Sequence, residues 1–555
     1  MSGRVVVIGA GSSGIAAVKC FQDAGFSDIV CYERRDVVGG LWYFKENSAS
    51  WADEACVNRS TVINTSKEFM CYSDYPMPDH YPNFCHHRDV EAYFQDYCKH
   101  FGINKYIQHN IEVVSLRKHN SYNSTGRWEL KLKDHKSGQE STEVFDFVLV
   151  ANGHHGEASI PNFPGQEKFK GVTMHSKEFK DLRSVDGKRA IVVGIGNSGG
   201  DCSVELSKYM KVFLATRRGA WILNRLVKNG MPWDYTFHTR FSTFVTKWLP
   251  RSYRNKIWKA QLNERFDHDL YRMTPVHEPD STHPTVNDEL PNRIAAGMVI
   301  VKPNIRSFTE KGVVFDDGSF EDDIDVVVFA TGYKVGYSFI DKSVLDIKSN
   351  KVEMFRNMFV PDLPKQTIAF LAVVQPLGAM FPLAEIQSRL AALVFKGDVK
   401  LPSPAVMKKD IQAHTSALQN RYIQTERHTI QVDWLPFMDE VAVLAGCKPS
   451  LLKLLFTDPV LFYYVAFGPG VPYQYRLHGP NPWPGARNAI LTTLYRVKKP
   501  FETRTIPNNS RHKSTSWFKL LLLTSATAVA LTFGVQYLKE SNVNVSEYLP
   551  SWIKL

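Results

Sequence analysis

Short, mostly apolar runs rich in β-branched residues recur along the chain. They occupy positions 5–8, 28–33, 145–150, 191–193, 211–216 and 326–329. Apolar runs of this length are typical of strands that are buried on both faces of a parallel sheet. Two of these runs, at 5–8 and 191–193, precede segments that can begin a helix. The pattern therefore predicts an α/β protein with two Rossmann-like strand–turn–helix units.

Glycine-rich turns join these two strands to the helices that follow. Their residues are Gly9, Ala10, Gly11, Ser12, Ser13 and Gly14 in the first turn, and Gly194, Ile195, Gly196, Asn197, Ser198 and Gly199 in the second. In a G-x-G-x-x-G turn the first glycine permits the tight bend and the second lets the backbone approach a pyrophosphate. The third allows close packing of the helix, whose N-terminal amides then face the phosphates. Two such turns predict two bound dinucleotides and hydride transfer between them.

The end of the strand after the first turn indicates which dinucleotide binds there. Glu33 ends the strand at 28–33. This is roughly 20 residues after the turn, where a carboxylate accepts hydrogen bonds from a ribose 2′-hydroxyl. A 2′-phosphate would be repelled by the same carboxylate. The first site is therefore predicted to bind FAD or NAD, and FAD is the choice that fits a second, NADPH-binding site.

The second strand ends differently. Thr216, Arg217 and Arg218 follow its apolar residues, and arginine forks match the geometry of a phosphate. This ending predicts NADPH, whose 2′-phosphate the pair would bind, with Arg225 as a second contact to the same phosphate. A solvated basic turn is the alternative interpretation of the Arg217–Arg218 pair.

The order of these signals predicts one nucleotide domain inserted in another. Residues 1–168 would form the first part of the FAD domain and 169–324 the NADPH domain. Residues 325–508 would return to the FAD domain and add helices of a substrate channel, and 509–555 would form a C-terminal membrane anchor. The small-residue turns that follow two of the apolar strands would let the chain cross between the domains.

A helical insertion is predicted within the NADPH domain at about 222–290. Residues 221–273 are dense in aromatic and basic side chains and show no alternating strand pattern. Their aromatic side chains either pack inward or form a face that rests on a membrane surface.

Composition narrows the class of protein. The chain has 555 residues, of which 44% are hydrophobic and 22% charged, as is ordinary for globular domains. Its eight cysteines include no C-x-x-C pair, which argues against a zinc site and against the disulfide reductases. We therefore expect no metal. The net charge of +11 comes without a basic run interleaved with aromatic residues, so we expect no nucleic-acid partner.

A hydrophobic segment near the C-terminus predicts membrane attachment. Residues 520–538 contain no charged side chain, and about 20 apolar residues cross a bilayer core. Basic residues precede this segment in greater number than they follow it, so the positive-inside rule places the catalytic body in the cytosol. We expect a tail-anchored protein of the endoplasmic reticulum membrane. A helix lying in one leaflet is the alternative, because the segment is only moderately apolar.

One spaced motif carries a family resemblance. Phe169, Gly171, His175 and Phe179 stand at the spacing F-x-G-x-x-x-H-x-x-x-F, which resembles the identifying motif of the flavin-containing monooxygenases, most of all the animal microsomal, dimethylaniline N-oxide-forming type. Related Baeyer–Villiger enzymes usually carry Trp where this chain has Phe179. Further matching segments are 39–42, 64–68, 153–155, 194–201, 330–333, 387–389 and 483–488.

The resemblance implies the cofactors FAD and NADPH, with dioxygen and small-molecule amines and sulfides as substrates. NADPH would reduce the flavin, dioxygen would add to give a C4a-hydroperoxide, and a soft nitrogen or sulfur centre would attack it. The chemistry would thus reside in the cofactor. Baeyer–Villiger oxidation of ketones is the alternative reaction, and a membrane-bound scaffold with a degenerate nucleotide fold is the alternative class. A homo-oligomer is possible. Further cofactor-binding residues implied by the resemblance are Gly40, Leu41, Trp42, Asn64, Thr65, Gly200, Asp201 and Thr331.

Asn64 is the predicted catalytic residue. Its neutral amide can donate a hydrogen bond to the peroxide without transferring a proton to it. The alternative is an N-cap for a helix that begins at Thr65. His175 is expected to organise the linker between the domains and to take no part in the chemistry.

Overall fold

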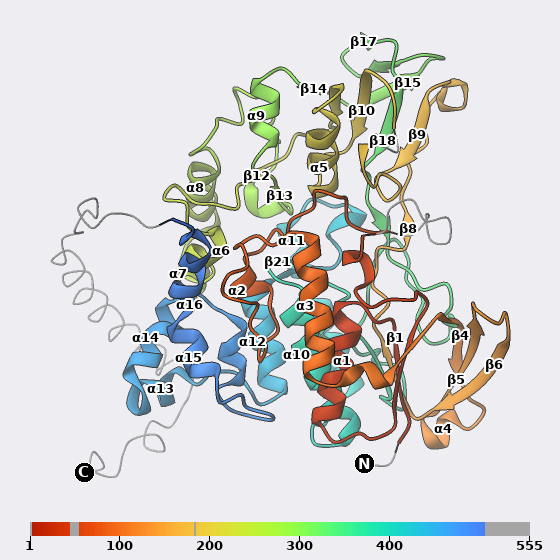
Figure 1. Ribbon diagram of the computed structural model, residues 1–555, viewed down its shortest axis with the longest axis vertical. Helices are drawn as coiled ribbons and strands as arrows, with labels where there is room; N and C mark the ends of the chain where they lie inside the picture. The colour runs from red at the N-terminus through yellow and green to blue at the C-terminus, as the bar shows by residue number, and fades with distance from the viewer. Residues whose placement is uncertain (1–2, 45–54, 183–184, 505–555) are drawn as a thin grey trace.

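Two five-stranded parallel sheets organise the computed structural model, which describes residues 3–44, 55–182 and 185–504. Figure 1 shows the second sheet and its helices at the top, and the first sheet below with the helices that cover it. The α/β class with two Rossmann-like units is confirmed.

The first sheet has the strand order β20-β7-β1-β2-β3. Its strands are β1 Val5–Ile8, β2 Ile29–Glu33, β3 Ile107–His109, β7 Phe147–Val150 and β20 Ile368–Phe370. All of its pairings are parallel, and β1 lies between β2 and β7. The chain therefore completes this sheet only after it has built the second one, as the prediction of an inserted domain requires.

The second sheet has the order β14-β11-β10-β18-β9. Its strands are β9 Val172–His175, β10 Arg189–Val193, β11 Lys211–Ala215, β14 Val299–Lys302 and β18 Val326–Phe329. Strand β18 pairs with both β10 and β9 and therefore belongs to this sheet. The predicted domain boundary at 324 is too early, because the apolar strand completes the second sheet before the chain crosses back.

The segment between β11 and β14 is largely helical, as predicted. It contains β12 Ile222–Leu223, α6 Trp233–Phe237, α7 Arg240–Trp248, α8 Arg251–Leu262, β13 Thr285–Val286 and α9 Leu290–Ala295. Trp233 and Trp258 pack on a small core that includes the buried Trp221. Trp248 and Tyr253 instead expose 56% and 63% of their surface. The aromatic side chains therefore divide between the interior and the surface.

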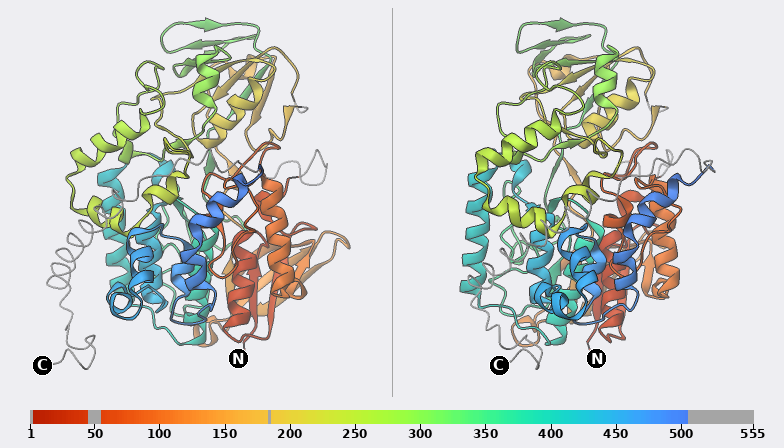
Figure 2. Two further views of the ribbon diagram at one scale, coloured as in Figure 1. Left: turned by 60° about the vertical axis from the view of Figure 1, so that its left-hand side comes forward. Right: turned by 90° about the vertical axis from the view of Figure 1, so that its left-hand side faces the viewer.

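Further helices occur outside the insertion. The remaining helices are α1 Ser12–Asp23, α2 Lys67–Met70, α3 His87–His100, α4 Tyr122–Thr125, α5 Asn197–Leu206, α10 Phe381–Lys396, α11 Pro404–Arg421, α12 Trp434–Leu444, α13 Leu451–Thr457, α14 Pro459–Phe467, α15 Ala486–Leu491 and α16 Thr493–Lys498. Helix α10 packs along α1, and α7 of the insertion contacts α14. Figure 2 shows the insertion helices beside the blue C-terminal helices in both views.

Smaller sheets complete the fold. An antiparallel sheet extends from the first domain and consists of β4 Ile111–Lys118, β5 Trp128–Asp134 and β6 Glu140–Phe145. The other short strands are β8 Glu157–Ala158, β15 Ile305–Phe308, β16 Val313–Phe315, β17 Phe320–Glu321, β19 Tyr333–Lys334, β21 Gln375–Leu377 and β22 Gln431–Asp433.

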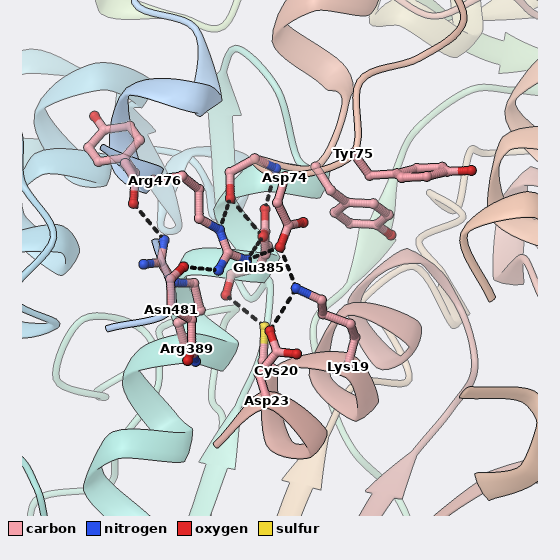
Figure 3. Close-up of polar contacts among 12 residues, drawn as sticks. Lys19, Cys20, Asp23, Asp74, Tyr75, Glu385, Arg389, Arg476 and Asn481 are labelled. Carbon is pink, nitrogen blue, oxygen red and sulfur yellow. Dashed lines mark hydrogen bonds and ion pairs between the residues drawn. The ribbon is translucent and has the colours of Figure 1, made fainter. Parts of the chain in front are cut away.

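A buried ionic network joins α1 to the C-terminal part (Figure 3). Arg476 lies 2.6 Å from Glu385 of α10 and 2.8 Å from Asp74, and Lys19 of α1 forms an ion pair with the same aspartate. The side chains of Arg476 and Glu385 are each 1% exposed. Buried charges are tolerated only when they are paired and hydrogen-bonded. The network therefore fixes the helix that follows the first glycine turn against segments that are distant in the sequence.

Within residues 3–44, 55–182 and 185–504, no helix combines the length and the apolar character needed to cross a bilayer. The anchor predicted at 520–538 lies outside the described residues.

Candidate active site

The first glycine turn joins β1 to α1 with a backbone that admits no side chains at key points. Gly9 has φ +97°, and a Cβ on Gly14 would lie 1.8 Å from the Gly9 carbonyl oxygen. A Cβ on Gly40 would lie 3.0 Å from Gly11 Cα. Two bare backbone segments therefore meet at the N-terminus of α1. This arrangement suits a bound pyrophosphate.

Residues 39–42 form the wall opposite this turn. The 3-10 helix η1 spans Gly40–Trp42, and Arg35 donates a hydrogen bond of 2.7 Å to the Gly40 carbonyl. The Trp42 ring packs edge-on against Phe381, whereas Leu41 keeps 39% of its surface exposed. Arg35 and Phe381 thus hold residues 40–42 in place, and the sequence alone does not reveal these contacts.

Glu33 lies at the end of β2, as predicted, and its carboxylate is buried. One oxygen accepts a hydrogen bond of 2.7 Å from the Ala10 amide, and the other accepts one of 2.9 Å from the Arg35 amide. Each carboxylate oxygen can accept more than one hydrogen bond. Glu33 therefore braces the glycine turn and still has lone pairs for a ribose hydroxyl, the role that the sequence predicts.

The second glycine turn repeats this geometry between β10 and α5. Gly194 has φ +100°, and a Cβ on Gly199 would lie 2.0 Å from the Gly194 carbonyl oxygen. A Cβ on Gly194 would lie 2.7 Å from the carbonyl oxygen of Ala330, which follows β18. Ser198, on the first turn of α5, is exposed. The chain thus contains two loops of the same design, each at the N-terminus of a helix.

Three predicted cofactor residues on α5 hold the helical insertion in place. Asn197 accepts a hydrogen bond of 2.8 Å from the Val286 amide, and Asp201 accepts one of 3.0 Å from Asn287. A Cβ on Gly200 would lie 3.1 Å from the same asparagine Nδ2. Burial raises the pKa of Asp201 to about 6. The structure therefore places these residues in contact with β13 and with Asn287, which follows it, and the sequence did not predict these contacts.

The end of β11 presents free cationic groups, as the NADPH prediction requires. Thr216 accepts a hydrogen bond of 3.1 Å from the Gly219 amide and closes the turn. Arg217 and Arg218 are exposed, and neither makes a hydrogen bond or an ion pair with any residue that the structure describes. Two unpaired guanidinium groups at this position fit a phosphate guest.

Arg225 has partners that the sequence did not predict. It donates hydrogen bonds of 2.6 Å to Asn64 Oδ1 and 3.2 Å to the Ile63 carbonyl, and it forms an ion pair of 2.8 Å with Asp288. Every nitrogen of the guanidinium is thus engaged. The structure therefore shows Arg225 holding the Asn64 segment, and its contact with the 2′-phosphate stays a prediction.

The interpretation of Asn64 as a helix cap is wrong. Helix α2 begins at Lys67, and its N-cap is Ser66, which makes no side-chain cap hydrogen bond. The Ser66 amide instead donates a hydrogen bond of 2.6 Å to the buried carboxylate of Asp234, on α6 of the insertion. A distant carboxylate therefore performs the capping role, and it was missed because no local pattern reveals it.

The remaining predicted residues lie at the crossing between the two sheets or beside it. Thr65 is buried, and Thr331 donates a hydrogen bond of 2.5 Å to the Ser159 carbonyl. His175 is fully buried and lies 3.0 Å from the Gly332 carbonyl, with its ring edge-on to Tyr333. These contacts support the linker role expected of His175. No cluster of metal-binding side chains occurs in the described part of the chain.

Two Rossmann-like sheets, each with a glycine turn at a helix N-terminus, define a flavoprotein of the class that pairs FAD with a nicotinamide dinucleotide. The family model described as "Flavin-binding monooxygenase-like" matches residues 2–535. The chain therefore belongs to the flavin-containing monooxygenase family, is an enzyme, and uses FAD and NADP(H).

Curated relatives align along nearly the whole chain. Flavin-containing monooxygenase 5 of Rattus norvegicus is 46% identical over 94% of this chain and 97% of its own length. Dimethylaniline monooxygenase [N-oxide-forming] 2 of Mus musculus is 41% identical over 97% of this chain and 99% of its own.

Solved structures share the fold at lower identity. S-allyl-L-cysteine S-oxygenase from Allium sativum aligns with a TM-score of 0.61 and 19% identity, covering 90% of this chain and 99% of its own. An open structure of cyclohexanone monooxygenase aligns with a TM-score of 0.58 and 16% identity, covering 80% and 98%.

Proposed function

We propose that this enzyme uses NADPH and dioxygen to oxygenate soft nucleophilic nitrogen and sulfur centres of small molecules. The observation that carries the proposal is the orientation of the Asn64 amide. An arginine has only donors, so the amide oxygen must face Arg225, at 2.6 Å. The Nδ2 group is then directed away from Arg225 as a neutral donor. The name of the N-oxide-forming relative also favours this reaction.

The residues of both loops fit the two cofactors. The turn from Gly9 to Gly14 and the carboxylate of Glu33 would hold FAD, and the turn from Gly194 to Gly199 with Arg217 would hold NADPH. When bound, the flavin supplies the activation of dioxygen after its reduction by NADPH. Asn64 Nδ2 would donate a hydrogen bond to the activated oxygen. An uncharged amide does so without delivering a proton.

Oxygenation of amines and sulfides is distinguished from ketone oxidation by the products. The purified enzyme is given NADPH and ¹⁸O₂ with a tertiary amine, a thioether or a ketone, and the masses of the products are measured by mass spectrometry. We expect one labelled oxygen in the N-oxide and in the sulfoxide, formed faster than any ester from the ketone. Faster formation of a labelled ester or lactone would replace this proposal with the Baeyer–Villiger alternative.

We propose further that the protein resides on the endoplasmic reticulum membrane with its catalytic body in the cytosol. The uncharged segment at 520–538 and the basic residues before it support this location. Trp248 and Tyr253 of the insertion add exposed apolar surface.

A further inference from the structure

Arg427 lies against the second glycine turn although it belongs to another part of the chain. It is on the 3-10 helix η6, Glu426–His428, which precedes β22 in the segment that follows the first sheet. A Cβ on Gly196 would lie 3.2 Å from Arg427 Nη2. Gly196 is the N-cap of α5, a helix of ten residues. The guanidinium thus stands where the fingerprint lets a pyrophosphate approach the backbone.

The guanidinium has no partner among the described residues. No hydrogen bond or ion pair joins it to another side chain or to a backbone carbonyl there, and it remains accessible to solvent. Its surroundings nevertheless lower its pKa through desolvation, with no carboxylate to oppose the effect. A solvent-accessible guanidinium without a partner in the described part of the chain has its donors free for the oxygens of an anion.

Two buried histidines lie close enough to Arg427 for its charge to disfavour their protonation. Burial lowers the pKa of His428 to about 4, and the charges of Arg427 and Arg218 lower it further. Burial likewise lowers the pKa of His283 to about 3, again with a contribution from Arg427. No acidic side chain opposes the shift at either histidine. The electrostatics therefore favour an anionic guest at this position.

We propose that Arg427 binds the pyrophosphate of NADPH from across the domain boundary, opposite the amides at the N-terminus of α5. Guanidinium forks bind phosphate oxygens in a bidentate manner. Arg217 would recognise the 2′-phosphate, and Arg427 the diphosphate that NADH also carries. The proposal rests on NADPH use by this enzyme and not on the identity of the oxygenated substrate.

The position of Arg427 determines which parts of the molecule the bound coenzyme contacts. Arg427 belongs to the FAD-binding part, whereas Gly196 belongs to the inserted domain. A coenzyme bound between Arg427 and Gly196 would therefore contact both parts of the molecule.

Binding of three probes to the oxidised holoenzyme tests the proposal by calorimetry. NADP⁺ carries both phosphate groups, NAD⁺ lacks the 2′-phosphate, and adenosine 2′-monophosphate lacks the pyrophosphate. Arg427→Ala should weaken the binding of NADP⁺ and of NAD⁺ about ten- to a hundredfold, which is the contribution of a charge-assisted contact. The affinity for adenosine 2′-monophosphate should stay unchanged. Arg217→Ala should weaken the binding of NADP⁺ and of adenosine 2′-monophosphate and leave the affinity for NAD⁺ unchanged.

Controls keep the result interpretable. Lys409→Ala removes an exposed cation of α11 and should change none of the three affinities. Arg427→Lys keeps the charge and should recover part of the affinity if the alanine variant loses flavin or stability. Unchanged NADP⁺ and NAD⁺ binding in Arg427→Ala would overturn the proposal, as would a loss confined to NADP⁺. Failure of the unmodified enzyme to bind NADP⁺ would instead refute the assignment of the second site.

Discussion

At the scale of single residues, the orientation of Asn64 decides whether its amide can serve the chemistry. Asn64→Leu removes the donor and the contact with Arg225, and Asn64→Asp keeps an oxygen for Arg225 but removes the donor. Both variants should form less oxygenated product and more hydrogen peroxide per NADPH. Loss of one such preorganised donor costs on the order of 10²–10³ in rate.

The measurement is the ratio of peroxide to product per NADPH consumed, at a temperature where all proteins are folded. Reduction of the flavin by NADPH should stay close to normal in both variants. If Asn64→Asp keeps the normal ratio, the Nδ2 donor is dispensable and backbone amides must supply the hydrogen bond.

Arg225 offers a second test at this scale, because sequence and structure give it different roles. If it positions Asn64 through the 2.6 Å hydrogen bond, Arg225→Ala should raise the peroxide-to-product ratio and change the KM for NADPH little. A phosphate contact predicts the reverse, a higher KM for NADPH with an unchanged KM for NADH and normal coupling. Steady-state kinetics with both coenzymes distinguish these outcomes.

At the scale of elements, Asp234 of α6 holds the N-terminus of α2. Burial raises the pKa of this carboxyl to about 6, although the Ser66 amide opposes the shift. Between an ordinary aspartate pKa of about 4 and this value, the folded protein binds more protons than the unfolded chain. The contribution of this group to the free energy of unfolding therefore falls as the pH rises through that window.

Asp234→Asn should lack this contribution, because an amide does not titrate and its oxygen can still accept from Ser66. Urea unfolding between pH 4 and 7 should show the stability of the unmodified protein falling relative to the variant. The relative change is about 1.4 kcal/mol for each unit of pKa shift. Asp28→Asn, at an exposed carboxylate, is the matched control. A difference that does not vary with pH would show that Asp234 stays ionised throughout.

The same scale shows how far sequence predicts structure. The strands at 5–8 and 326–329 were predicted with the bounds observed for β1 and β18, because strands buried on both faces leave an uninterrupted apolar run. The start of α2 was missed, since its capping acceptor Asp234 lies 168 residues away. The glycine turns and Glu33 could be predicted from the residues next to them in the sequence. The contacts of Arg225 and Arg427 could not, because they join different domains.

At the scale of the whole molecule, the described residues already contain both nucleotide sites. Deleting residues 516–555 removes the uncharged segment at 520–538 and should release the protein from membranes, as fractionation would show. The flavin content should stay unchanged, because both nucleotide sites lie outside the deleted residues. The absorbance of bound flavin measures this content. A truncated protein that still sediments with membranes after a high-salt wash would show another attachment site. The exposed Trp248, Tyr253 and Ile257 of α7 and α8 would then be replaced by serine in turn.

The central claim is that a chain with two dinucleotide sites oxygenates soft nucleophiles. A single-turnover experiment tests it most directly. Enzyme reduced with one equivalent of NADPH is mixed with dioxygen and then, after a delay, with a thioether, a tertiary amine or a ketone. We predict close to one sulfoxide or N-oxide per flavin and little hydrogen peroxide, even after a delay. Stoichiometric peroxide with no oxygenated amine or sulfide, or product from the ketone alone, would contradict the claim.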